Sequence, residues 1–425
     1  MSEVTQKSNT GKEDVLFRSC LYLFAFLLPF EGTVGRIGLG YFGGIKILGT
    51  LIVVALILKV LADAESVRAL VKNIMTTISM SFFLFIFWSL LSVFWAPNSD
   101  WTLVKVSTYL GLFIVMQSVG LLSRNAVKRM WELLLVGAAL SLPFDFILPP
   151  SNEMLAASGR FTSGGQDPND YANLIVVILS VVFCGILPFR NEVRNRLWRF
   201  VLLSSIFVAI AAVLLSLSRT ALINLLAFVL AAVWLRRSVK SSVVLATFVA
   251  LARVFVILFP DFGELMAQRY STLQRLLVEE KVWAGRIDIW RAAVTVFTER
   301  PLTGVGAGNF AFVSPYYSYY AALIAATRED GGGGVAHNTF LSVLAETGMI
   351  GFLLFGALLL SAYVLAWRLL KRGENLGYGL LVGLITYTIA GLTLTWEYVK
   401  IPYLIYGSLL ALEVRSGKRV DMCSS

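Results

Sequence analysis

Histidine, cysteine and charged side chains are scarce in this sequence. The 425 residues include one histidine and three cysteines, and only 15% of them are charged. One histidine with three scattered cysteines excludes a conventional zinc site, and three such cysteines make no disulfide framework. Hydrophobic residues make up 57% of the chain. No soluble domain of this length needs so much apolar surface, so the sequence predicts a polytopic membrane protein.

Apolar runs recur along the whole chain. A helix needs about 20 predominantly apolar residues to cross a bilayer. We identify about twelve candidate spans: 16–30, 43–62, 78–96, 103–122, 131–148, 171–189, 200–217, 219–235, 241–259, 338–367, 376–395 and 401–414. No small-x-small cleavage site follows the first run, so we expect a retained span and not a removed signal peptide. The expected fold is an all-α bundle.

The residues behind the net charge of +10 are distributed according to the predicted membrane topology. Lysine and arginine cluster in alternate short loops, around residues 124–129, 190–199, 236–240, 368–372 and 415–419. Twelve spans place all five clusters on the side of the N-terminus, and the positive-inside rule makes that side cytoplasmic. We therefore expect cytoplasmic N- and C-termini, and no nucleic-acid partner.

One long polar stretch interrupts the spans and divides the chain into three parts. We expect spans 1–9 in residues 1–259, a large loop on the outer face in 260–336, and spans 10–12 with a short cytoplasmic tail in 337–425. The loop is predicted to be partly helical, because residues 269–301 carry apolar side chains at helical spacing and Pro301 stops the pattern. A Gly-rich turn follows at 301–310.

Two motifs on the outer face carry candidate arginines at helix boundaries. SGRFTSGGQDPNDYANL (158–174) places Asp167 and Asn169 around Pro168, which is ordinary helix-start chemistry, whereas Arg160 has no capping role. LLSLSRTALINLL (214–226) splits a long apolar stretch with a tight turn, which keeps Arg219 at the membrane boundary. A guanidinium there is either a snorkelling side chain or a functional one. We favour function, because an outer arginine opposes the charge bias.

Two further motifs flank the end of the loop. In AGRIDIWRAA (284–293), Arg286 and Trp290 share a helix face, although taken alone a solvated face is the simpler interpretation of Arg286. In AHNTFLSVLAETG (336–348), His337 directly precedes a helix that Asn338 would cap. A helix dipole disfavours protonation at its N-terminus, and a neutral imidazole is what a general base requires.

Together, these four motifs resemble the O-antigen ligase and polymerase superfamily of bacterial envelope glycosyltransferases. The match lies in the segment from Arg160 to Asn169, LSLSRTA, GRIDIW followed by ERPLTGVGAGNF, and AHNTFLSVLAETGMIG. Order, spacing and topology agree over roughly residues 150–360, with the long loop between the ninth and tenth spans. The resemblance implies a GT-C-like membrane protein.

The resemblance also implies an activity and its residues. Similar proteins act on undecaprenyl-diphosphate-linked glycans at the periplasmic face of the inner membrane, without a metal or other cofactor. His337 corresponds to the proposed base, and Arg219, Arg286 and, less closely, Arg160 to the diphosphate-binding arginines. Glu397 corresponds to a recurring acidic residue near the last outer turn. Supporting roles would then fall to Asn338, Asn169, Trp290 and Glu397.

Several functions within and beyond this superfamily remain open. We favour an O-antigen ligase with lipid A–core as acceptor, because one outer loop dominates and the tail is short. A repeat-unit polymerase is the first alternative. A lipid-linked glycan transporter is the second, but the expected polar groups are one-sided and not at mid-membrane.

Overall fold

The computed structural model describes residues 2–32, 44–143, 161–162, 167–187, 195–236 and 281–423, and all regular secondary structure within these ranges is helical. The longer helices are α1 (Ser2–Leu27), α3 (Gly44–Ala62), α4 (Ala64–Ile74), α5 (Thr77–Leu91), α6 (Ser99–Gly120), α7 (Arg124–Ser141), α10 (Pro168–Gly185), α11 (Arg196–Leu215), α12 (Arg219–Arg236), α15 (Lys281–Glu299), α18 (Thr339–Lys371), α19 (Asn375–Gly391) and α20 (Lys400–Cys423). Short helices lie at η1 (Leu28–Phe30), η3 (Ser92–Phe94), α16 (Phe310–Val313), η4 (Ser314–Tyr316) and α17 (Tyr319–Ala325).

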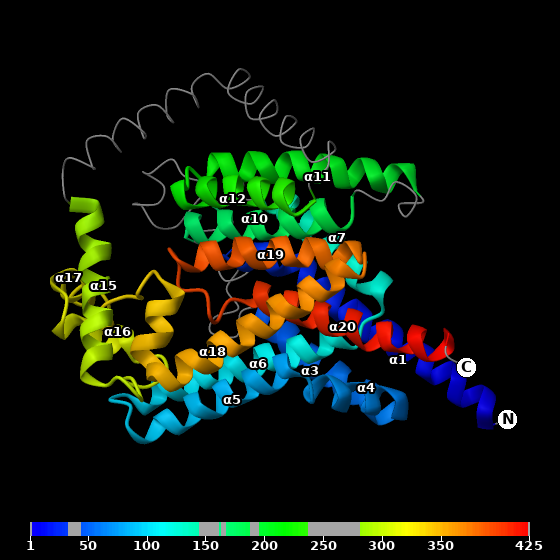
Figure 1. The fold of residues 1–425 in the computed structure, drawn as a ribbon, viewed down its shortest axis with the longest axis horizontal. Coiled ribbons are helices and arrows are strands. Elements are labelled where there is room, and N and C mark those ends of the chain that lie inside the picture. Colours follow the sequence, from blue (N-terminus) through cyan, green and yellow to red (C-terminus); the bar gives the residue numbers. More distant parts are fainter. Residues whose placement is uncertain are drawn as a thin grey trace, which may run out of the picture.

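Most helices run side by side in one bundle (Figure 1). Helix α15 crosses one end of the bundle with α16 and α17, whereas both chain termini lie at the other end (Figure 1). We call residues 281–336 the cap and the end of the bundle beside them the cap end. Helix α10 packs against α19 and α12, α18 packs against α5, and α20 packs against α6.

In the described part of the chain, five helices are long and apolar enough to cross a membrane, or six if the bent pair of α3 and α4 counts as one span. The shorter helices α12 and α19 are also apolar. The chain is therefore a polytopic membrane protein. Helices overlap eleven of the twelve expected spans, and the remaining one, 241–259, lies outside the described residues. The number of spans and their sidedness stay predictions.

Small residues allow close packing where the end of α10 meets the start of α19. A Cβ atom on Gly379 of α19 would lie 2.4 Å from the Val181 carbonyl oxygen and 2.7 Å from Gly185 of α10. The two helix backbones are thus nearly in contact, as is common where small residues line a membrane-helix interface. Helix α10, which begins at the cap end, is the most enclosed of the five candidate spans.

Helix α18 is two helices joined at a break. Gly348 has φ 64° and ψ −168°, which interrupts the helical backbone after Thr347. The cap supplies carbonyl oxygens for the amides that follow the break: Met349 N–H donates to Pro301 O at 2.8 Å and Ile350 N–H to Leu302 O at 3.4 Å. A Cβ on Gly348 would lie 2.3 Å from the Leu302 oxygen, so this approach requires glycine.

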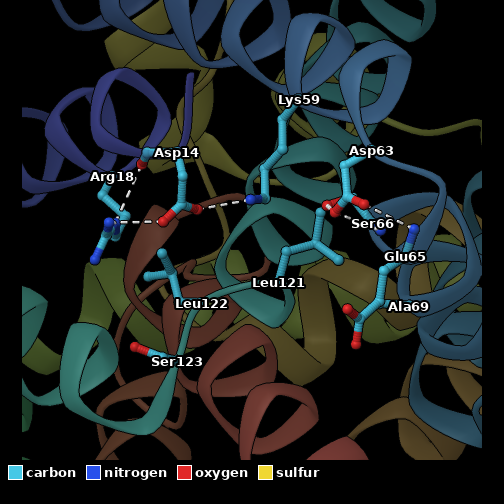
Figure 2. A pocket seen from close by; sticks show the side chains of 10 residues that line it. All are labelled: Asp14, Arg18, Lys59, Asp63, Glu65, Ser66, Ala69, Leu121, Leu122 and Ser123. Carbon is cyan, nitrogen blue, oxygen red and sulfur yellow. Dashed lines mark hydrogen bonds and ion pairs between the residues drawn. The ribbon is translucent and has the colours of Figure 1, made fainter. Parts of the chain in front are cut away.

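A polar cavity of about 250 Å³ lies at the terminal end of the bundle (Figure 2). The Asp14 carboxylate pairs there with Arg18 at 2.6 Å and with Lys59 of α3 at 2.7 Å. The Asp63 side chain accepts hydrogen bonds from the first amides of α4. These elements are distant from the cap, so this cavity is separate from the residues that the sequence motifs predict for the site (Figure 1).

Candidate active site

His337 lies at the junction between the cap and α18. Its φ of 49° is a left-handed value, which is uncommon for a residue other than glycine and turns the chain sharply before the helix. The next residue caps the helix as predicted: Asn338 Oδ1 accepts hydrogen bonds from Phe340 N–H and Leu341 N–H, both at 3.0 Å. Asn338 Nδ2 also donates to Leu392 O at 3.1 Å. The backbone at His337 is therefore fixed by the cap of α18.

Helix α15 holds the same segment from the other side of the junction. Trp290 Nε1 donates to the carbonyl oxygen of Ala336 at 3.0 Å. Ile289 and Val296 of α15 are buried in an apolar cluster that also includes Ala336. The predicted helical spacing in this part of the loop is confirmed, and α15 ends at Glu299, directly before Arg300 and Pro301. Trp290 thus contacts the residue before His337, and its supporting role stays a prediction.

Arg286 lies in the electrostatic field of both Arg219 and His337. Burial lowers the pKa of Arg286, Asp167 raises it and the positive charge of Arg219 lowers it. Burial also lowers the pKa of His337, as does Arg286, while Asp167 acts in the opposite direction. Three elements thus bring these groups together: α15 carries Arg286, α12 begins with Arg219 and Asp167 caps α10.

Neither arginine makes a hydrogen bond or ion pair with another residue in the described part of the chain, although each is partly buried. Two adjacent guanidiniums with open donors form a site for an anion that offers several oxygen atoms. Their mutual repulsion and desolvation would be relieved by such an anion. Arg160, the third arginine predicted to bind diphosphate, lies outside the described residues.

Polar side chains between α10 and α12 position Arg219. Ser218 Oγ donates to Asn169 Oδ1 at 2.8 Å and accepts from Ala221 N–H at 3.3 Å at the start of α12. Leu217 before it has a left-handed φ of 52°. Asn173 Nδ2 of α10 donates to Thr220 Oγ1 at 3.0 Å. Asn169 is therefore a positioning residue for the turn that precedes Arg219, and its wider functional role stays a prediction.

The turn between α19 and α20 links α10 to α18. Trp396 Nε1 donates to Asp170 Oδ1 at 2.7 Å, and Trp396 N–H donates to Thr339 Oγ1 at 2.8 Å. The Thr339 hydroxyl in turn donates to Leu394 O at 2.8 Å. This turn thereby ties the first residue of α18 to the first turn of α10. Sequence reasoning missed Trp396, whose side chain carries no periodic signal.

Glu397 lies in a buried ionic cluster and not beside the arginines. Its Oε1 atom lies 2.8 Å from Lys105 Nζ of α6, and Glu346 Oε2 of α18 lies 4.0 Å from the same nitrogen. Gly308 N–H donates to Glu346 Oε2 at 2.7 Å. Of these three residues, the sequence analysis singled out only Glu397. The signal available in the sequence was the presence of three ionisable residues inside or beside apolar spans, where such residues usually pair with one another.

Comparison with known families gives one match. Residues 204–356 match the family model described as O-antigen ligase. This segment is similar to the O-antigen ligase family. No curated protein matched the chain. The matched segment contains Arg219, Arg286 and His337, whereas Asn169 and Glu397 lie outside it. The superfamily resemblance drawn from the motifs is thus confirmed, and the match covers Arg286 together with Arg219 and His337, the two groups with which it interacts electrostatically.

Proposed function

We propose that this protein is an O-antigen ligase that transfers polysaccharide from undecaprenyl diphosphate to a sugar hydroxyl of lipid A–core. The reaction would take place at the periplasmic face of the bacterial inner membrane, where the cap would lie, with both termini in the cytoplasm. The observation that carries the proposal is the pair of open guanidiniums, Arg219 and Arg286, with Arg286 in electrostatic range of the partly buried imidazole of His337. All three fall within the O-antigen ligase match.

The proposed chemistry is an inverting displacement at the anomeric carbon of the donor. The acceptor hydroxyl gives its proton to His337 as its oxygen forms a bond to that carbon. The bond between the anomeric carbon and the phosphate oxygen breaks, and its electron pair leaves with undecaprenyl diphosphate. Arg219 and Arg286 neutralise the charge that develops on the diphosphate, a contribution for which one lost donor typically costs about 100-fold or more in rate. Because two fixed cations meet this need, the proposal includes no metal.

The environment of His337 suits the role of a base. Burial and Arg286 both lower the pKa of His337, which favours the neutral imidazole near pH 7. Arg286 therefore has two roles in this scheme. It binds the leaving group and keeps the neighbouring base free of its proton.

The decisive experiment is reconstitution of the purified protein with undecaprenyl-diphosphate-linked O-antigen, with and without lipid A–core, in the presence of chelator. We expect glycan on lipid A–core from the wild type and none from His337→Ala. Longer undecaprenyl-linked chains made without lipid A–core would instead identify a repeat-unit polymerase. A fully active His337→Ala variant would refute the base assignment.

The same assay tests the arginines with a matched control. Arg286→Lys replaces a planar fork with a point charge and should lose most of the activity, since lysine does not reproduce bidentate contacts. Arg291→Lys makes the same change at an exposed position of the same helix and should retain it. Equal activity in both variants would show that Arg286 does not bind the diphosphate.

A further inference from the structure

A second cavity lies at the cap end of the bundle, and the transfer chemistry described so far does not use it. Its volume is about 360 Å³, within the usual size range of small-ligand sites. It lies between α6, the start of α18, the Gly-rich turn, the segment that leads to His337, and the turn between α19 and α20. Its lining includes Trp101, Lys105, Ala311, Val335, Thr395 and Tyr398.

Aromatic rings and ionic groups share this lining. Trp101 packs edge-on against Phe312, with ring centroids 5.9 Å apart, which fixes its orientation. The Lys105 ammonium lies 4.1 Å from the centroid of the Tyr398 ring. A pyranose ring needs this combination, because its C–H faces pack against aromatic rings while its hydroxyl groups require charged or polar partners.

Two buried oxygen atoms in this region have no hydrogen-bond partner among the described residues. Thr395 lines the cavity, and the oxygen of its hydroxyl, on a residue that is 6% exposed, is one of them. Glu397 Oε2, on the carboxylate that pairs with Lys105, is the second. An unsatisfied buried polar group is costly, so an unpaired hydroxyl on a residue that lines a cavity favours a polar ligand nearby.

The position of the cavity relates it to His337. Val335, two residues before His337, lines it, and Thr395 directly precedes the Trp396 that binds Asp170. Arg219 and Arg286 are absent from the lining and lie on α12 and α15. The diphosphate and the contents of this cavity would therefore approach His337 from different elements. An in-line displacement requires such a separation between the leaving group and the attacking hydroxyl.

The cavity also reaches the outside of the bundle. Val104 and Thr108 lie on its wall and are exposed on α6, which is a candidate membrane span. A sugar attached to a membrane lipid can thus enter from the lipid side of α6 without leaving the bilayer surface.

We infer that this cavity binds the sugar ring of the lipid-linked acceptor, with Trp101 as its packing surface and Thr395 and the Lys105 cluster as its polar partners. The inference rests on the proposed transfer reaction. Trp101 and Thr395 are positioning residues in this scheme, because they hold the acceptor sugar and take no part in proton transfer.

The test is steady-state transfer by the purified full chain, with lipid A–core and undecaprenyl-linked O-antigen varied in turn. Thr395→Val removes one hydrogen bond and should raise the KM for lipid A–core by roughly 3- to 10-fold. Trp101→Ala removes the packing surface and should raise it by about 10-fold or more. The KM for the donor should not change. Matched controls are Thr298→Val and Trp234→Ala, both at exposed positions away from the cavity.

Each alternative result has a distinct meaning. A rise in the donor KM alone would place a donor sugar in the cavity and overturn the assignment to the acceptor. Unchanged KM values for both substrates would overturn the sugar site itself. If Trp101→Ala does not fold, Ala311→Leu fills the cavity and makes the same prediction. Absence of transfer by the wild type would refute the proposed function, which is a separate outcome.

Discussion

Replacing Lys105 with methionine removes the ammonium group that lies between two buried carboxylates. The Glu397 side chain is 0% exposed and that of Glu346 is 7% exposed, so neither carboxylate can recover its hydration. Breaking a buried ion pair by removing one partner typically costs about 3–5 kcal/mol. We expect Lys105→Met to destabilise the protein by an amount in this range.

The reciprocal variant should cost less. Glu397→Gln keeps an oxygen atom that can accept from Lys105 and leaves Glu346 at 4.0 Å as a counter-charge. The expected loss is about 1–3 kcal/mol, the value of one hydrogen bond to a charged group. The double variant removes both members of the closest pair, so it should be more stable than the sum of the single losses predicts, by about 0.5–3 kcal/mol.

The assay is unfolding of purified protein in mild detergent by increasing amounts of SDS, followed by tryptophan fluorescence. Lys72→Met, at an exposed position on α4, is the matched control and should have little effect. Strictly additive losses in the double variant would refute the reasoning, because they would mean that Lys105 and Glu397 act independently.

Two further predictions concern His337 and its helix. Burial and Arg286 lower the pKa of His337 from 6.5, so transfer should persist as the pH falls to 6.5 and decline only at lower pH, where the imidazole is protonated. Arg286→Gln removes the opposing cation and should move this decline to higher pH in the remaining activity; an identical acid limb in a pH–rate profile would contradict the coupling. Asn338→Ala removes the cap oxygen of α18 and should cost about 0.5–2 kcal/mol in SDS unfolding. Asn338→Asp keeps that oxygen and should cost less, and equal losses would argue against capping.

Local features of the fold could be predicted from the sequence because they depend on neighbouring residues. Apolar runs located the helices, Pro301 marked the end of α15, and Asn338 was recognised as a helix cap. Helix α4 could not be found in this way. Its buried side chains are Ser66 and Asn73, so an analysis of apolar runs passes over it, and the bend of 119° at Asp63 is a tertiary feature.

The assembly of the site was only partly predictable. The resemblance brought Arg219, Arg286 and His337 together, and the structure places Arg286 within electrostatic range of each of the other two. The pairing of Lys105 with Glu397 joins residues 292 positions apart, and the bond between Trp396 and Asp170 joins residues 226 apart. No local pattern specifies such contacts, because they depend on how distant helices pack.

The break at Gly348 determines which part of the molecule His337 moves with. An unbroken α18 of 33 residues would be about 50 Å long, well beyond the roughly 30 Å of a hydrocarbon core. The break leaves a short first segment whose carbonyl oxygens at Ala345 and Glu346 accept from Val305 and Gly306 of the cap. Mechanically, this segment is therefore part of the cap. If the caps of two such proteins were exchanged, the junction between the two sequences would have to lie at Gly348. His337 would then be transferred together with the surface that orients it.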